Sequence, residues 1–150
     1  MKPLIVLIVT FLIALVAFKI FRNAYELALS ARIALSITLL FTAMGHFAFS
    51  EGMAMMVPEF IPFKKEMVYL TGLIEIAAAI GLHVPQLRPL TGWLLILFFV
   101  LVLPANIKAA MEQVDYQKAT FGGPGVTYLW FRVPLQILFI VWTYFSAVRN

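Results

Sequence analysis

The amino-acid sequence predicts an all-α transmembrane helical bundle. Of its 150 residues, 63% are hydrophobic and 12% are charged, whereas a soluble domain carries about 25% charged residues. The mean hydropathy is +0.99. Apolar stretches long enough to cross a bilayer alternate with short polar segments, most of which contain proline or glycine. We therefore expect a single transmembrane domain, residues 1–150, with most of its length in the membrane.

The composition also excludes several classes of protein. The net charge is +4, but the basic residues lie singly or as one pair at the ends of apolar segments. This pattern does not indicate nucleic-acid binding and instead favours the lipid bilayer as partner. Cysteine is absent, which excludes disulfides and thiolate metal sites. No P-loop, dinucleotide-binding glycine motif or Ser/His/Asp pattern is present.

The first predicted span runs from Pro3 to Phe21, about 28 Å at roughly 1.5 Å per residue. A signal peptide is the alternative, because a charged start and an apolar run also fit that class. The best cleavage candidate, Ala28-Leu29-Ser30, comes late and fits poorly. We favour a retained helix, which makes residues 1–22 an additional N-terminal span.

Four further spans complete the bundle. Their predicted ranges are Ala31–Phe49, Met67–Leu82, Leu90–Leu103 and Val126–Val148. Five spans are therefore expected, or four if the first is removed or lies flat. The basic residues that flank the first helix favour the N-terminus outside and the C-terminus inside. A count of basic residues over all the connecting segments divides equally between the two faces and does not decide the orientation.

The connecting segments carry their own signals. Ser50–Glu66 mixes Glu, Lys and Pro with Met and Phe, which is typical of a segment lying in the membrane interface, here as a lid. Pro104 interrupts the fourth span, and Ala105–Gln117 is expected to continue as an interfacial helix. The run Gly122–Gly125 ends that helix.

Five polar side chains fall inside these apolar segments, where such groups are costly and mark function by default. They are His46, Glu75, Asn106, Arg132 and Gln136. Counted from the inner face at about 1.5 Å per residue, four of them lie about 18–24 Å up. Glu75 lies about 10 Å up, one to two turns deeper. We expect all five to line one polar pocket in the outer half of the bilayer.

Helical spacing supports inward-facing stripes. Arg132 and Gln136 share a face, as do Thr42 with His46 and Thr71 with Glu75. The structural alternative remains open: a Glu75–Arg132 ion pair and amide side chains that hold helices together. His and Glu alone are too few ligands to predict a metal site.

An ordered set of short motifs resembles the DoxX-like family of small bacterial membrane proteins. The motifs are Gly45-His46-Phe47, Met56-Val57-Pro58, Ile61-Pro62, Val68–Glu75, Gly81-Leu82 with Pro85, Pro104-Ala105-Asn106-Ile107, Arg132–Gln136 and Trp142. The resemblance covers residues 31–150 and implies a four-helix core in a bacterial cytoplasmic (inner) membrane. The first helix is an addition to that pattern.

Two functions follow as expectations. The resemblance implies a membrane or accessory subunit of a quinone-linked redox complex, with quinone or another lipophilic molecule as ligand. The chain has no self-contained catalytic motif, so redox partner subunits would supply the electrons. The alternative is a non-enzymatic assembly factor or scaffold, in which the intramembrane polar residues are structural.

Overall fold

The computed structural model describes residues 2–115, 118–123 and 125–149, and these are helical throughout most of their length. The main helices are α1 (Lys2–Arg22), α2 (Leu27–Ala48), α4 (Lys64–Gly81), α5 (Arg88–Leu101) and α7 (Leu129–Thr143). Short helices are α3 (Ser50–Ala54), α6 (Leu103–Met111), the 3₁₀ turn η1 (Val126–Tyr128) and the π-helical turn η2 (Tyr144–Val148). The predicted all-α bundle is confirmed.

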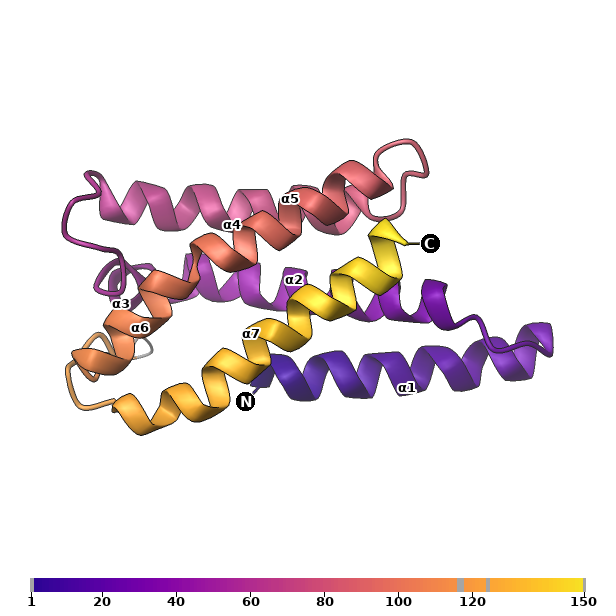
Figure 1. Ribbon diagram of the computed structural model, residues 1–150, viewed down its shortest axis with the longest axis horizontal. Coiled ribbons are helices and arrows are strands. Elements are labelled where there is room, and N and C mark those ends of the chain that lie inside the picture. The colour runs from indigo at the N-terminus through magenta and orange to yellow at the C-terminus, as the bar shows by residue number, and fades with distance from the viewer. Residues whose placement is uncertain (1, 116–117, 124, 150) are drawn as a thin grey trace.

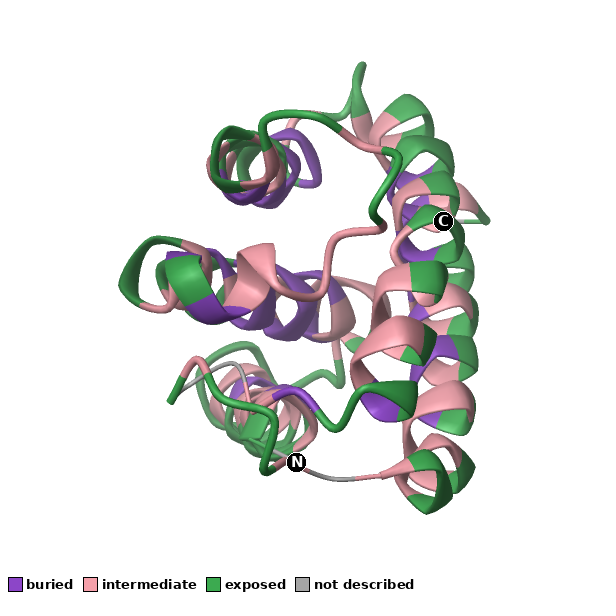
Figure 2. Cartoon of the chain, turned by 90° about the vertical axis from the view of Figure 1, so that its left-hand side faces the viewer, coloured by how far each residue is buried: buried purple, intermediate pink, exposed green. Residues whose placement is uncertain are grey.

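The helices form two layers (Figures 1 and 2). One layer holds α4, α2 and α1 side by side, with α2 in the middle, and α5 and α7 cross it obliquely on one face. The central helix α2 buries residues along most of its length, from Ser30 to Ala43. The apolar core lies between the layers and includes Leu35, Leu39, Phe99 and Phe139.

The outer surface of the bundle is apolar. Large hydrophobic side chains are exposed on each main helix, for example Leu12, Leu73, Leu97 and Ile137, each more than half exposed. A soluble protein rarely exposes apolar surface this continuous, whereas lipid tails cover it without cost. Among the residues that the structure describes, four helical segments are long and apolar enough to cross a membrane: Lys2–Arg22, Leu27–Ala48, Arg88–Met111 and Val126–Val148. The protein is an integral membrane protein in contact with the bilayer.

Helix α4 is the fifth long helix, and its composition differs from the other four. Its first turn contains Lys64, Lys65 and Glu66, and Glu75 lies further along. Its outward residues Leu70, Leu73, Ile74 and Ile80 are apolar and exposed, as in a lipid-facing helix. It runs beside α2 along its whole length (Figure 1). A fifth span formed by α4 therefore remains our prediction.

The fourth predicted span is correct in outline but its continuation is wrong. Helix α5 ends at Leu101, and α6 begins at Leu103 with Pro104 in its first turn, where a missing N–H does no harm. Helix α6 ends at Met111, not at Gln117. Residues 112–115 form a turn and an isolated bridge from Asp115 to Thr120; Gln117 lies outside the described residues.

Gly123 explains why the chain turns back after α6. Its N–H donates to the carbonyl of Gln113 at 2.7 Å. A Cβ atom at this position would lie 2.5 Å from the carbonyl oxygen of Val114. Because backbone atoms cannot move aside cheaply, only glycine fits, and the hairpin forms in place of further helix.

Candidate functional site

The contact between His46 and Glu75 is the centre of the intramembrane polar set. His46 lies in the last turn of α2, and Glu75 lies in the middle of α4. The Nε2 atom of His46 is 3.3 Å from the Oε2 atom of Glu75, and their side chains are 17% and 6% exposed. The two titratable groups therefore face one another with little access to solvent.

The surroundings of His46 determine where its protons are. Its Nδ1 atom is 3.1 Å from the carbonyl oxygen of Val68 and 3.0 Å from Oγ1 of Thr71. The Thr71 hydroxyl donates its own hydrogen to the same Val68 carbonyl at 2.8 Å. A carbonyl oxygen only accepts, so Nδ1 carries a hydrogen. Any further exchangeable proton at this contact therefore lies on Nε2 of His46 or on the Glu75 carboxyl that faces it.

The pair can hold one exchangeable proton on Oε2 or Nε2, and Oε2 is buried with no hydrogen-bond partner among the described residues. With that proton on Glu75 a neutral carboxyl faces a neutral His46, and with it on His46 a cation faces the Glu75 carboxylate. A proton that passes between Nε2 and Oε2 converts one state into the other without moving either helix. The pair can thus hold or transfer a proton inside the bundle.

The depth expected for Glu75 is wrong, and the register of α2 against α4 explains the error. The count assumed that Ala31 and Leu82 lie level. In the structure Gly72 on α4 lies level with His46 on α2, since a Cβ atom at Gly72 would lie 3.1 Å from the Cβ atom of His46, so near this contact α4 is displaced by about five residues along α2. At roughly 1.5 Å per residue this shift is about 7 Å.

The direction of the two side chains accounts for the remaining difference in depth between His46 and Glu75. Side chains on a helix tilt toward its N-terminus. Because α2 and α4 are antiparallel, His46 tilts down toward Glu75 while Glu75 tilts up toward His46. Gly72 lies between them and allows close approach, since a Cβ atom there would lie 3.1 Å from the Cβ atom of His46.

Two further residues act on the Glu75 carboxyl. The Thr42 hydroxyl is within hydrogen-bonding reach of it, and the charge of Arg132 on α7 attracts it. Thr42 also donates to the carbonyl of Leu39 at 3.0 Å. The sequence-based pairing of Glu75 with Arg132 is thus an electrostatic attraction, and the close contact of Glu75 is with His46.

The two amide residues of the predicted set have other roles. Gln136 is 2% exposed and donates through Nε2 to the carbonyl of Phe99 at 2.6 Å, near the end of α5. Its Oε1 atom is buried with no partner among the described residues. Asn106 is half-buried on α6, where the structure shows no side-chain hydrogen bond to another described residue. Gln136 therefore ties α7 to α5.

Two hollows stand out on the bundle, and neither is lined by the five predicted residues. One, of about 300 Å³, is lined by Ala48, Phe49, Ser50, Glu51, Gly52, Lys118 and Ala119. The other, of about 230 Å³, is lined by Leu4 on α1 and by Trp130, Phe131, Pro134, Leu135 and Leu138 on α7. No group of three or more metal-ligating His, Cys, Asp or Glu side chains occurs among the described residues.

The segment predicted to form a lid is held against α6. Lys108 donates through Nζ to the carbonyl of Val57 at 2.6 Å and contacts Glu59 at 3.1 Å. Lys64 contacts the same carboxylate at 3.1 Å. Hydrogen bonds from Lys64 and Lys108 hold the pKa of Glu59 below its ordinary value. The segment between α3 and α4 is thus fastened at one point by two lysines.

Fold and site together define a class: an α-helical integral membrane bundle with a buried His–Glu pair between two antiparallel helices. Residues 35–147 match the model of a domain of unknown function, DUF8561, and the chain belongs to this family. The matched segment contains α4–α7 and most of α2, whereas α1 lies outside it. No curated protein and no solved structure matches the chain.

Proposed function

We propose that this protein is a membrane subunit of a quinone-linked redox complex in a bacterial inner membrane, and that His46 and Glu75 exchange protons beside the quinone. The observation that carries the proposal is the 3.3 Å contact between Nε2 and Oε2, with Nδ1 held by a backbone carbonyl. The resemblance to the DoxX-like family supports the same class.

The chemistry needs a proton donor but no redox centre in this chain. Reduction of a quinone to a quinol takes two electrons and two protons. A partner subunit supplies the electrons, and the pair delivers one proton at a time and is then reprotonated. Burial suits this role because a paired, half-buried imidazole and carboxyl keep their proton away from bulk water.

The test is to purify the protein from native bacterial membranes in a mild detergent and measure bound quinone per protein. We expect the wild type to retain quinone together with a redox partner subunit. His46→Gln and Glu75→Gln should lose most of the quinone while staying folded. Glu26→Gln is the matched control, because it removes an exposed carboxylate near Arg22 at the other end of the bundle.

Absence of quinone and of a redox partner in the wild type would overturn this proposal. The second candidate, an assembly factor or scaffold, would then stand. One observation favours it: the hollow of about 300 Å³ lies where the two interfacial segments meet, with Ser50–Gly52 on one side and Lys118–Ala119 on the other. A client protein that crosslinks to this hollow, without quinone, would support that role.

A further inference from the structure

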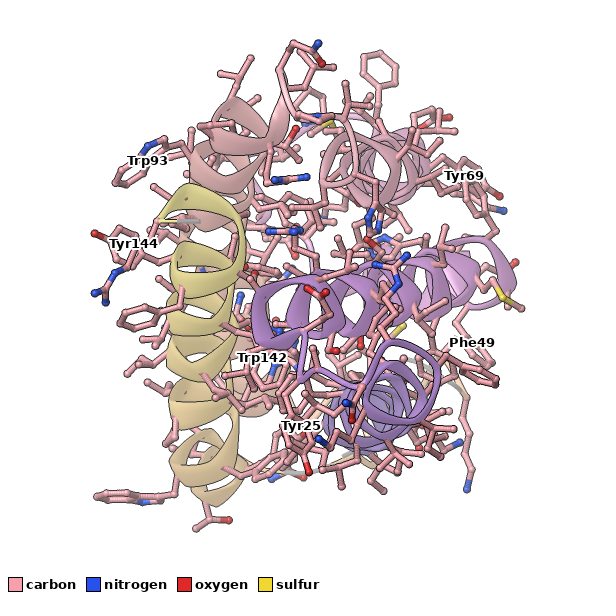
Figure 3. The ribbon with its side chains drawn as sticks, turned by 90° about the vertical axis from the view of Figure 1, so that its right-hand side faces the viewer. Tyr25, Phe49, Tyr69, Trp93, Trp142 and Tyr144 are labelled. Atoms are coloured by element: carbon pink, nitrogen blue, oxygen red, sulfur yellow. The ribbon has the colours of Figure 1, made fainter. Side chains whose placement is uncertain are left out.

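One end of the bundle is strongly basic. Here α2 begins, α4 ends, α5 begins and α7 ends (Figure 1; Figure 3 views this end). The basic residues here are Lys19, Arg22, Arg32, Arg88 and Arg149. The acidic residue here is Glu26, which is 4.0 Å from Arg22. The rest of the chain carries six basic and six acidic side chains, so the net positive charge of the protein is concentrated at this end.

Two arginines and a histidine converge at this end: Arg32 on α2, Arg88 at the start of α5 and His83 after α4. Arg32 is only 8% exposed, and Arg88 is close enough to repel its charge. Burial and then the charges of Arg32 and Arg88 hold the pKa of His83 below its ordinary value. Like charges gathered in this way cost free energy unless an anion joins them.

Their contacts with the protein use only part of their hydrogen-bonding capacity. Arg32 donates through Nη1 to the carbonyl of Ser146 at 2.9 Å, and Arg88 donates through Nε to the carbonyl of Leu82 at 3.1 Å. A guanidinium has five N–H donors. The Nε atom of Arg32 is buried with no partner among the described residues. Donors thus remain on a side chain that is nine-tenths buried.

His83 offers a further donor at the mouth of this cluster. Ser36 gives its hydroxyl hydrogen to the carbonyl of Ala79, so the Nε2 atom of His83, 2.9 Å from Oγ of Ser36, is the donor in that contact. The Nδ1 atom has no hydrogen-bond partner among the described residues and becomes a donor on protonation. His83 itself is exposed.

The start of α5 also favours an anion at this end of the bundle. Helix α5 begins at Arg88, and its N-cap residue Leu87 makes no side-chain capping bond. The first N–H groups of a helix and its dipole favour an anion, not a basic residue. A phosphate placed between Arg32 and Arg88 would satisfy both the guanidinium groups and this helix end.

We propose that Arg32, His83 and Arg88 form a binding site for a phosphate-bearing anion. A phospholipid headgroup and free phosphate share this chemistry. Aromatic side chains favour the lipid: Trp93 and Tyr144 stand on the outer surface at this end, with ring centroids 6.2 Å apart (Figure 3). Such residues mark the level of the headgroups. The lipid phosphate lies at that level, beside His83.

The test is a thermal-shift titration of the full chain in a neutral detergent at about 1 M salt, where the Debye length is only about 3 Å. The probes are phosphatidylglycerol, phosphatidylcholine and inorganic phosphate. We expect phosphatidylglycerol to raise the melting temperature more than phosphatidylcholine. Arg88→Gln and His83→Gln should each weaken the apparent affinity, the former by about tenfold, as expected for a lost charged hydrogen bond.

Arg22→Gln is the matched control. It removes the same charge from the same end, but at an exposed residue on α1, whose last turns extend beyond the other helix ends (Figure 1). Its affinity should stay within about twofold of wild type at this salt. An equal loss in Arg22→Gln and Arg88→Gln, or no preference for either phosphate anion over phosphatidylcholine, would overturn the site. A response to inorganic phosphate equal to that to phosphatidylglycerol would support the site and assign it to a soluble anion.

Discussion

The two polar clusters of this bundle balance their charges in different ways. In the cluster near the end of α2, a carboxyl on α4 faces an imidazole and is attracted by Arg132. In the cluster at the basic end, Arg32 and Arg88 repel each other and disfavour a charge on His83, and among the described residues the three side chains bond to backbone carbonyls and Ser36. The charges of the first cluster are balanced by other side chains of the protein, whereas those of the second are balanced by the anion that we propose binds there. The comparison indicates that a substitution that removes polarity from the first cluster should destabilise the fold, whereas a substitution that removes a charge from the second should mainly weaken anion binding.

The largest effect is expected for Glu75→Leu. This change removes the carboxyl that contacts His46 and that attracts Arg132. Breaking a buried charge pair in this way costs about 3–5 kcal/mol of the free energy of unfolding. Glu75→Gln keeps the shape and one hydrogen bond and should cost only about 1 kcal/mol. Reversible unfolding in detergent micelles measures both; equal losses would show that the charge of Glu75 is unimportant for the fold.

A smaller effect is expected where α2 and α4 approach each other. A Cβ atom at Gly72 would lie 3.1 Å from the Cβ atom of His46 and 3.1 Å from the ring of Phe47. Gly72→Ala should therefore cost about 1–3 kcal/mol and lengthen the His46–Glu75 contact. At Gly45 the nearest atom, on Met53, is at 3.4 Å. Gly45→Ala should be neutral or stabilise by about 0.5–1 kcal/mol. The same unfolding assay compares the two, and a Gly72→Ala protein as stable as wild type would disprove the close packing.

In the second cluster, Arg88→Gln should change stability by less than about 1 kcal/mol in a neutral detergent without added anion. The loss of its bond to the Leu82 carbonyl is offset by the relief of repulsion from Arg32. Thermal unfolding of the purified protein checks this expectation. A loss as large as that of Glu75→Leu would mean that the basic cluster is as structural as the first.

The smallest effect concerns pH. The pKa of His83 is lowered in the folded protein by burial and by Arg32 and Arg88, while Ser36 is its hydrogen-bonding neighbour. The unfolded chain therefore binds a proton more readily. The contribution of neutral His83 to the free energy of unfolding is complete above its pKa in the unfolded chain, about 6.5, and declines as the pH falls below that value.

Melting temperatures between pH 7.5 and 5.5 should therefore fall more steeply for the wild type than for His83→Gln. Phosphatidylglycerol should flatten the wild-type profile, because a bound anion favours the protonated imidazole. Identical slopes in the two proteins, with and without the lipid, would place His83 outside the cluster.

Helix order and membrane character could be read from the sequence because both depend on local composition. The run Pro3–Phe21 and the segment Val126–Val148 are apolar over a membrane-spanning length, and the structure has helices there. His46, Glu75, Arg132 and Gln136 stood out because polar groups are rare in such segments. The end of α6 at Met111 could not be read, because the hairpin that follows depends on the contact of Gly123 with Val114.

The sequence by itself determined that the chain is an all-α membrane bundle and that a few polar residues lie within it. Only the tertiary structure decided which of them meet. The close approach of Gly72 to His46 and the bond from Ser36 to Ala79 set the register of α4 along α2, and this register brings Glu75 to His46 and His83 to Ser36. Register between two antiparallel helices arises from side-chain packing and a few hydrogen bonds across the interface, and neither leaves a periodic signal in the chain.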